Sequence, residues 1–119
     1  MTGAATFSHH VPAAPAITYP TEGTVVSSNN LIVSWEHVAH TVTGEPIDIT
    51  GYEIIITKEV EDDPNGFSRP TYDVHVPADR NTLAVPTEFL ESNTEYELEI
   101  LALEKSGNQT ISVLFFETE

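Results

Sequence analysis

The sequence contains no cysteine among its 119 residues. Disulfide bonds and thiolate metal sites are therefore excluded, and histidines and carboxylates are the metal ligands that remain. The fold has to be held together by a hydrophobic core instead. A chain of this length can bury roughly two-thirds of its unfolded surface, so we expect one domain with its own core.

Basic residues are also scarce. Lys58, Arg69, Arg80 and Lys105 stand against nineteen acidic residues, which gives a formal net charge of −15. Binding to nucleic acid depends on cationic groups that replace phosphate counterions, and four scattered ones do not provide them. An anionic membrane surface repels such a chain for the same reason. The composition therefore argues against nucleic acid and membranes as partners.

Long apolar runs are missing as well. The longest, "EIII" and "SVLFF", fall far short of the roughly 20 residues of a membrane-spanning helix, so we expect no membrane insertion. Helical periodicity is nearly absent too. In its place, apolar and polar residues alternate with a period of two, which is typical of half-buried β-strands.

Seven short segments follow this pattern: "PAITYP", "LIVSW", "YEIIIT", "TYDVHV", "TLAV", "EYELEILA" and "ISVLFF". Turn-forming stretches such as "HTVTGEP", "EDDPNG" and "KSGN" separate them. This arrangement predicts an all-β fold, a seven-stranded antiparallel β-sandwich. Residues 1–14 are predicted to be a linker or the tail of a preceding module, and residues 15–119 the domain.

The stretch "FLESNTEYELEI" contains a tyrosine, Tyr96, directly before a strict alternation of glutamate and aliphatic residues. In immunoglobulin-like sandwiches a tyrosine near the start of strand F sends its hydroxyl back to the backbone upstream and so holds the corner between strands E and F. We predict this role for Tyr96, with Leu90 as the apolar plug beneath the corner. Trp35 and Tyr52 share the inward phase of their strands, and both are predicted to lie in the core.

Three motifs, "LIVSWE", "ITGYEIIIT" and "FLESNTEYELEILALEKSG", occur in this order. On these motifs residues 15–119 resemble a fibronectin type III domain. The family has a leucine, commonly a proline, a threonine and a tyrosine at positions taken here by Leu90, Ser92, Thr94 and Tyr96; Ser92 departs from the proline. The resemblance implies sheets A-B-E and C-C′-F-G.

The resemblance also implies a function. It suggests spacer, adhesion or ligand-display work in an extracellular or cell-surface multidomain protein, with neighbouring modules or another protein as partners. The Arg-Gly-Asp tripeptide of integrin-binding members is missing from the F–G loop, which reads "KSGNQT". Integrin binding is therefore not implied.

Recognisable catalytic motifs are absent. The chain has no Gly-x-Ser-x-Gly, no phosphate-binding loop and no His-Glu-x-x-His. We therefore predict a non-catalytic protein-interaction or spacer module without a cofactor.

The stretch "EVEDDPNG" gathers oxygen ligands of the kind that calcium prefers: Glu59, Glu61, Asp62, Asp63 and Asn65. It has two interpretations. One is a solvated, turn-forming loop between strands C and C′. The other is a calcium site, which would make the chain a ligand-binding module of a secreted enzyme or adhesin.

Four histidines, His9, His10, His37 and His40, are predicted to lie at the same pole of the sandwich. Imidazole nitrogens suit zinc or nickel, although no spacing here matches a closed zinc site. The alternative is that they are simply exposed loop residues.

Strand phase places a set of apolar residues on the outer face of the C-F-G sheet: Ile55, Leu101, Leu103, Leu114 and Phe116. Glu53, Glu97 and Glu99 are expected to surround them. An apolar centre with a charged rim is typical of a protein contact surface. Two alternatives remain open: a one-residue slip inverts the phase of a strand, or the N-terminal segment covers this face.

Overall fold

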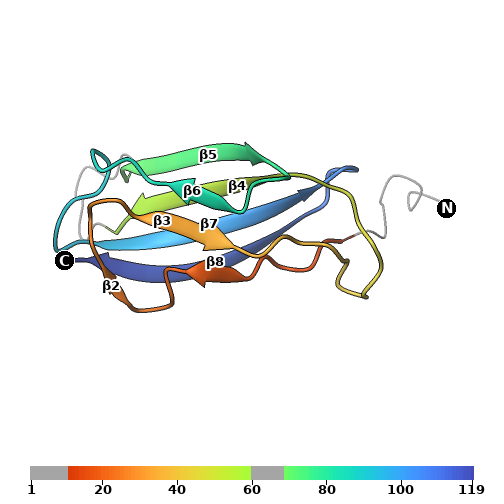
Figure 1. The fold of residues 1–119 in the computed structure, drawn as a ribbon, viewed down its shortest axis with the longest axis horizontal. Helices are drawn as coiled ribbons and strands as arrows, with labels where there is room; N and C mark the ends of the chain where they lie inside the picture. Colours follow the sequence, from red (N-terminus) through yellow and green to blue (C-terminus); the bar gives the residue numbers. More distant parts are fainter. Residues whose placement is uncertain (1–10, 60–68) are drawn as a thin grey trace.

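The computed structural model describes residues 11–59 and 69–119 and shows two β-sheets packed on a common core (Figure 1). The three-stranded sheet has the order β1-β3-β6, with β1 at Ile17–Tyr19, β3 at Ile32–Trp35 and β6 at Thr82–Ala84. The five-stranded sheet has the order β2-β8-β7-β4-β5, with β2 at Val25–Val26, β8 at Gln109–Thr118, β7 at Glu95–Glu104, β4 at Ile49–Lys58 and β5 at Thr71–Pro77. The predicted β-sandwich is confirmed.

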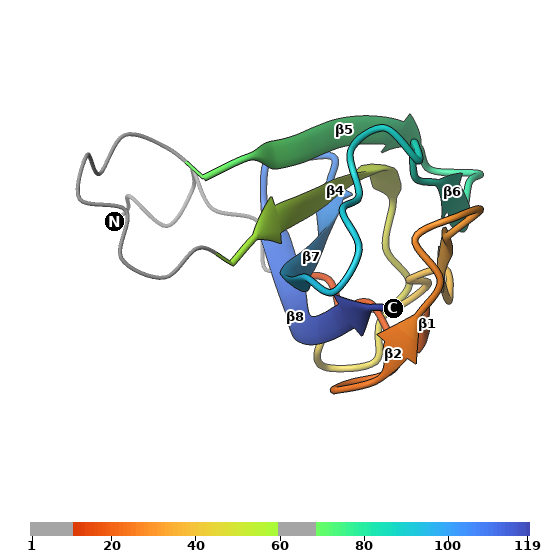
Figure 2. The ribbon, with the colours of Figure 1, turned by 90° about the vertical axis from the view of Figure 1, so that its left-hand side faces the viewer.

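The two layers are clearest in Figure 2, where β1 and β6 lie on one side and β4, β7 and β8 on the other. The sheet β1-β3-β6 contains the strands of the predicted A-B-E sheet. The strands β5, β4, β7 and β8 are those of the predicted C-C′-F-G sheet, in the order C′-C-F-G. The predicted membership of both sheets is therefore correct.

The structure has one strand more than the sequence predicts. The first predicted strand, "PAITYP", contains β1, which pairs with β3. The additional strand is β2, which lies outside every predicted strand and pairs in parallel with the end of β8, through Val25 with Glu117 and Val26 with Thr118. Between β1 and β2 lies Pro20, which has no N–H to continue the ladder. The chain changes sheets there, so the predicted all-antiparallel pairing is wrong at β2.

The core contains large side chains from both sheets. Trp35 of β3 packs against Tyr52 of β4 with ring centroids 5.5 Å apart, and Tyr96 of β7 stacks on Phe116 of β8 at 5.5 Å. The structure places all four residues that we assigned structural roles in this core: Trp35, Tyr52, Leu90 and Tyr96.

The predicted phase of β8 is wrong. Phe116 is fully buried and Leu114 is 9% exposed, whereas Ile111 and Val113 are 46% and 49% exposed. The register with β7 explains this, because Leu98 lies opposite Leu114 and Tyr96 opposite Phe116. Directly opposite residues share a face, so the inward phase of β7 fixes that of β8.

Residues 11–15 lie along the sandwich and contact its inward-facing side. The Ala13 amide donates to the His40 carbonyl (2.9 Å), and the Thr110 hydroxyl donates to the Ala13 carbonyl (3.2 Å). Because Thr110 belongs to the inward phase of β8, these residues do not cover the outer face of the five-stranded sheet. Residues 1–10 lie outside the described residues, and the boundary after residue 14 stays a prediction.

Candidate functional site: the outer face of the five-stranded sheet

The outer face is the side of the β8-β7-β4-β5 sheet that points away from the core. The strand register arranges its side chains in rows that run across the sheet. The two central rows are Val113, Glu99, Ile55 and Asp73, followed by Ile111, Leu101, Glu53 and His75. Apolar and acidic side chains therefore alternate across the first row, whereas the second row has its two apolar side chains on β8 and β7 and its two polar ones on β4 and β5.

The apolar part of this face lies along β7 and β8. Ile111 and Val113 are about half exposed, and Leu101, Leu103 and Phe115 are more deeply packed beside them. Of the predicted interface residues, Ile55, Leu101 and Leu103 lie on the outer face. Leu114 and Phe116 do not, because they point into the core. Ile111, Val113 and Phe115 occupy the corresponding outward positions, one residue out of phase with the prediction.

The acidic part consists of Glu53, Asp73, Glu97 and Glu99. Partial burial raises the pKa of Glu99, and the charge of Glu97 beside it raises this pKa further. The pKa of Glu53 is also raised, chiefly by a hydrogen bond shared with the carboxyl group of Asp73 and then by burial. Partial burial and neighbouring carboxyl groups therefore both disfavour ionisation at this face.

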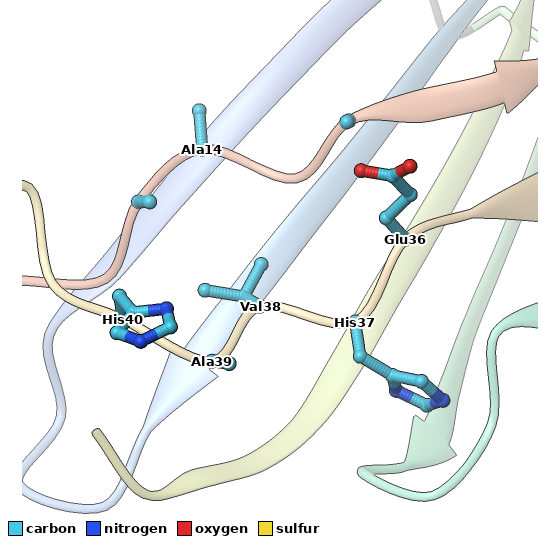
Figure 3. A pocket seen from close by; sticks show the side chains of 8 residues that line it. Ala14, Glu36, His37, Val38, Ala39 and His40 are labelled. Atoms are coloured by element: carbon cyan, nitrogen blue, oxygen red, sulfur yellow. The ribbon is translucent and has the colours of Figure 1, made fainter. Parts of the chain in front are cut away.

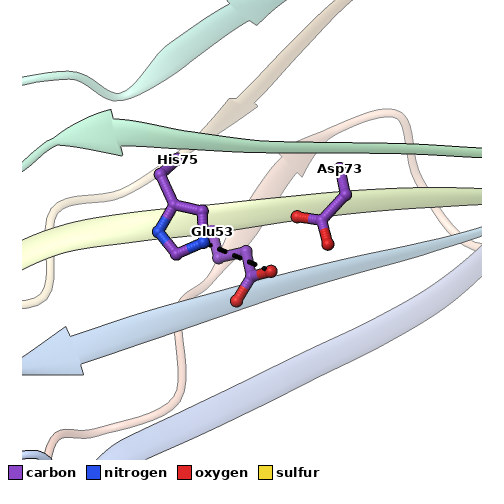
Figure 4. A group of neighbouring side chains, drawn as sticks. All are labelled: Glu53, Asp73 and His75. Atoms are coloured by element: carbon purple, nitrogen blue, oxygen red, sulfur yellow. Dashed lines mark ion pairs between the residues drawn. The ribbon is translucent and has the colours of Figure 1, made fainter.

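A histidine adjoins these acids. His75 lies opposite Glu53 on the neighbouring strand, and its Nε2 is 3.4 Å from Glu53 Oε2 (Figure 4). Asp73 lies two residues before His75 on β5 and so faces the same side. One ligand atom from each of these three residues lies within 4.8 Å of the others. Among residues 11–59 and 69–119 this is the one group of three such side chains.

Asp73 and His75 were not predicted from the sequence as possible metal ligands. The spacing Asp-x-His within "TYDVHV" was the available signal, because residues two apart on a strand face the same side. Their third neighbour, Glu53, precedes Asp73 by 20 positions and His75 by 22 in the chain, and only the register between β4 and β5 brings it opposite His75.

The predicted oxygen ligands for calcium are mostly outside the described residues. Glu61, Asp62, Asp63 and Asn65 fall within residues 60–68. Glu59 is described, and its Oε2 pairs with Arg69 Nη1 at 3.2 Å. The calcium site therefore stays a prediction.

Two of the four predicted histidine ligands are described. His37 and His40 are exposed and lie apart along the loop between β3 and β4 (Figure 3). The ring of His37 lies 6.3 Å from that of Tyr52. His9 and His10 fall outside the described residues, so the four-histidine site stays a prediction as well.

The same loop and residues 13–16 enclose a hollow of about 220 Å³ (Figure 3). Alanines contribute much of its lining, and Glu36, His37 and His40 are its titratable side chains. None of the described residues that line it carries a hydroxyl or thiol. The hollow therefore offers no hydroxyl or thiol nucleophile.

Sequence comparison agrees with this geometry. The model of the fibronectin type III domain family matches residues 18–116. The chain belongs to the fibronectin type III family. Domains of this family are generally non-catalytic modules, commonly used for protein interaction or as spacers in multidomain proteins.

Solved fibronectin type III domains share the fold. The third fibronectin III domain of human KIAA0343 protein superposes with a TM-score of 0.64 at 19% identity, covering 93% of this chain and 86% of the other. The domain of human collagen alpha-1(XX) chain has a TM-score of 0.55 at 19% identity, with 94% and 89% covered. The FN1-FN3 domains of chicken CNTN1 superpose with a TM-score of 0.50 at 19% identity, covering 87% of this chain and 33% of the other. A search of curated proteins found no match.

Within this fibronectin type III domain the Tyr96 hydroxyl accepts a hydrogen bond from the backbone N–H of Glu91 (2.7 Å). This is the bond expected of the tyrosine corner, and it joins the start of β7 to the turn that contains Leu90. Within the described residues no helix has the length and apolarity required to cross a membrane.

Proposed function

We propose that this fibronectin type III domain is a non-catalytic interaction or spacer module of a larger secreted or cell-surface protein, and that the outer face of the five-stranded sheet is its contact surface. The observation that carries the proposal is the exposure of Ile111 and Val113 on the same face as Leu101. Contiguous exposed apolar residues are typical of interaction sites.

Charge indicates the chemistry of the partner. Glu97 and Glu99 lie directly opposite Phe115 and Val113, so two carboxylates adjoin the outward-facing apolar residues of β8, which form an apolar strip. A partner that places apolar side chains on the strip and lysines or arginines over the carboxylates is complementary to this face. A second copy of the chain is not, because each copy has a formal net charge of −15.

The extracellular or cell-surface setting is part of the proposal. It is supported by the family and by the shared fold with a domain of collagen alpha-1(XX) chain. The proposed partners are neighbouring modules of the same protein or another protein with a basic, apolar surface.

The contact surface can be tested with a matched pair of substitutions. Ile111 on the outer face is 46% exposed, and Ile32 on β3 of the other sheet is 51% exposed. Thr keeps β-branching at both positions and removes apolar surface. The modules adjoining this domain in its natural chain are titrated against each variant, and binding is followed by NMR chemical shifts of the backbone amides.

We expect Ile111→Thr to weaken binding at least several-fold and Ile32→Thr to leave it unchanged. The perturbed amides should lie on β7 and β8. Equal weakening by both substitutions, or perturbation only at the ends of the sandwich, would contradict the assigned surface. Light scattering over a hundredfold concentration range, with and without calcium, should find the isolated domain monomeric throughout.

The calcium-dependent alternative has a simple test of its own. A ligand that binds only the native state raises the melting temperature by mass action. If residues 59–66 bind calcium, millimolar CaCl₂ raises the melting temperature and Asp62→Asn removes this rise. An unchanged melting temperature would contradict calcium binding by this segment, and it would not affect the proposed interaction role.

A further inference from the structure

The group Glu53, Asp73 and His75 has a geometry that differs from that of an ordinary acidic surface. Two of its members lie two residues apart on β5, and the third lies directly opposite His75 on β4. Because β4 is paired on both sides, by β5 and β7, its backbone is held in place. The register between β4 and β5 therefore places the three side chains at adjacent positions on one face (Figure 4).

The separations suit a small metal ion. Zinc binds nitrogen and oxygen ligands at about 2.0–2.2 Å, so two ligands of a tetrahedral ion lie roughly 3.3–3.6 Å apart. His75 Nε2 and Glu53 Oε2 are already 3.4 Å apart. Asp73 is exposed, and its ligand oxygen lies within 4.8 Å of the ligand atoms of the other two residues.

The ligand types favour a transition metal over calcium. Calcium takes six to eight oxygen ligands, whereas imidazole nitrogen combined with carboxylate oxygen suits zinc and its first-row neighbours. Solvent reaches the group, because His75 is 66% exposed, so an ion has a free path to it. Three protein ligands leave a position open to water.

Electrostatics favours a cation at this point. Glu53 and Asp73 share a hydrogen bond, and Glu99 and Glu97 add further negative charge nearby. Within the described outer face His75 is the one ionisable group of basic type. A divalent ion offsets the repulsion among these carboxylates, which a neutral imidazole does not.

We propose that Glu53, Asp73 and His75 form a binding site for one divalent transition-metal ion, with Zn²⁺ the best-fitting ion. The site is independent of the predicted calcium loop and of the histidines near the N-terminus. It also does not depend on the proposed interaction role, since an ion can bind the isolated domain.

The test is a titration of the metal-free domain with ZnCl₂, followed by calorimetry and by the imidazole ¹⁵N resonances of His75. His9 and His10 are replaced by glutamine in every protein, so that they do not compete for zinc. The informative variants are Asp73→Asn and His75→Gln. The matched controls are Asp79→Asn, at an exposed acid in the turn after β5, and His40→Gln, at an exposed histidine on another loop.

We expect one zinc per domain, a shift of the His75 ring nitrogens on binding, and no comparable binding of CaCl₂. Asp73→Asn and His75→Gln should each weaken binding at least tenfold, since the loss of even a supporting hydrogen bond costs a metal site about 10–100-fold. Both controls should bind as the parent does. Amide spectra establish that every variant is folded.

Three results would overturn the proposal. One is a zinc dissociation constant weaker than about 1 mM. Another is binding that persists in both Asp73→Asn and His75→Gln. The third is an equal loss in His40→Gln, which would place the ion at the loop between β3 and β4. None of these results bears on the Ile111 and Ile32 comparison.

Discussion

At the scale of single residues, two tyrosine hydroxyls anchor chain segments that have no strand partner. Tyr96 accepts from the Glu91 N–H at 2.7 Å, and Tyr52 accepts from the Val38 N–H at 2.8 Å. Both rings are buried in the core, and each hydroxyl reaches its edge. A buried tyrosine thereby satisfies a backbone donor that would otherwise lack a partner.

We expect Tyr96→Phe to lower the free energy of unfolding by about 1–3 kcal/mol, because the Glu91 N–H loses its acceptor while the ring still fills the core. Urea denaturation measures this change. Tyr19→Phe is the control, since Tyr19 is 45% exposed. If both variants are equally stable, the hydroxyl of Tyr96 does not hold the corner.

At the scale of strands, β7 and β8 show when a sequence pattern determines phase. In β7 glutamates alternate with aliphatic residues, so its inward side is evident from the sequence, and the structure agrees at Leu98 and Ile100. In β8 apolar side chains occupy both phases of "ISVLFF". The pattern alone then does not distinguish the two faces, and pairing with β7 decides between them.

The observed phase of β8 predicts that replacing two adjacent phenylalanines by alanine lowers the free energy of unfolding by unequal amounts. Phe116 is fully buried and stacks on Tyr96, so we expect Phe116→Ala to cost about 3–5 kcal/mol of unfolding free energy. Phe115 is partly exposed on the outer face, and Phe115→Ala should cost distinctly less. Urea denaturation of the two variants compares them directly. The reverse order would restore the phase that the sequence analysis assigned.

At the scale of the whole molecule, the acidic residues are unevenly paired with lysine and arginine. Two ion pairs lie near the ends of β4 and β5: Lys58 with Glu91 at 2.5 Å, and Arg69 with Glu59 at 3.2 Å. The carboxylates of the outer face have only the titratable His75 beside them. Partial burial, followed by the charge of Glu97, raises the pKa of Glu99, and a hydrogen bond shared with Asp73, followed by burial, raises the pKa of Glu53.

The raised pKa values of Glu53 and Glu99 predict a domain that becomes more stable on mild acidification. When the folded-state pKa of an acid is raised, its stability contribution is fully present below the ordinary pKa and is lost as pH rises through the raised value. With a chelator present, we expect the melting temperature to rise as pH falls from about 7 to about 5, because folding favours the protonated forms of Glu53 and Glu99.

Glu99→Gln provides the corresponding variant. It should raise the melting temperature at neutral pH and flatten the pH dependence. Glu45→Gln, at an exposed position between β3 and β4, should do neither. A melting temperature that falls steadily over this pH range in the parent protein would contradict the prediction.

The class of fold, the family and the residues of the tyrosine corner are all predictable from the sequence. Period-two alternation, turn chemistry and the "FLESNTEYELEI" stretch are local signals, legible within about a dozen residues. The tertiary structure alone decided the phase of β8, the parallel pairing of β2, and the meeting of Glu53 with Asp73 and His75. The reason is physical: each of these depends on which residues lie opposite one another on different strands, and strand pairing joins segments that are distant in the chain.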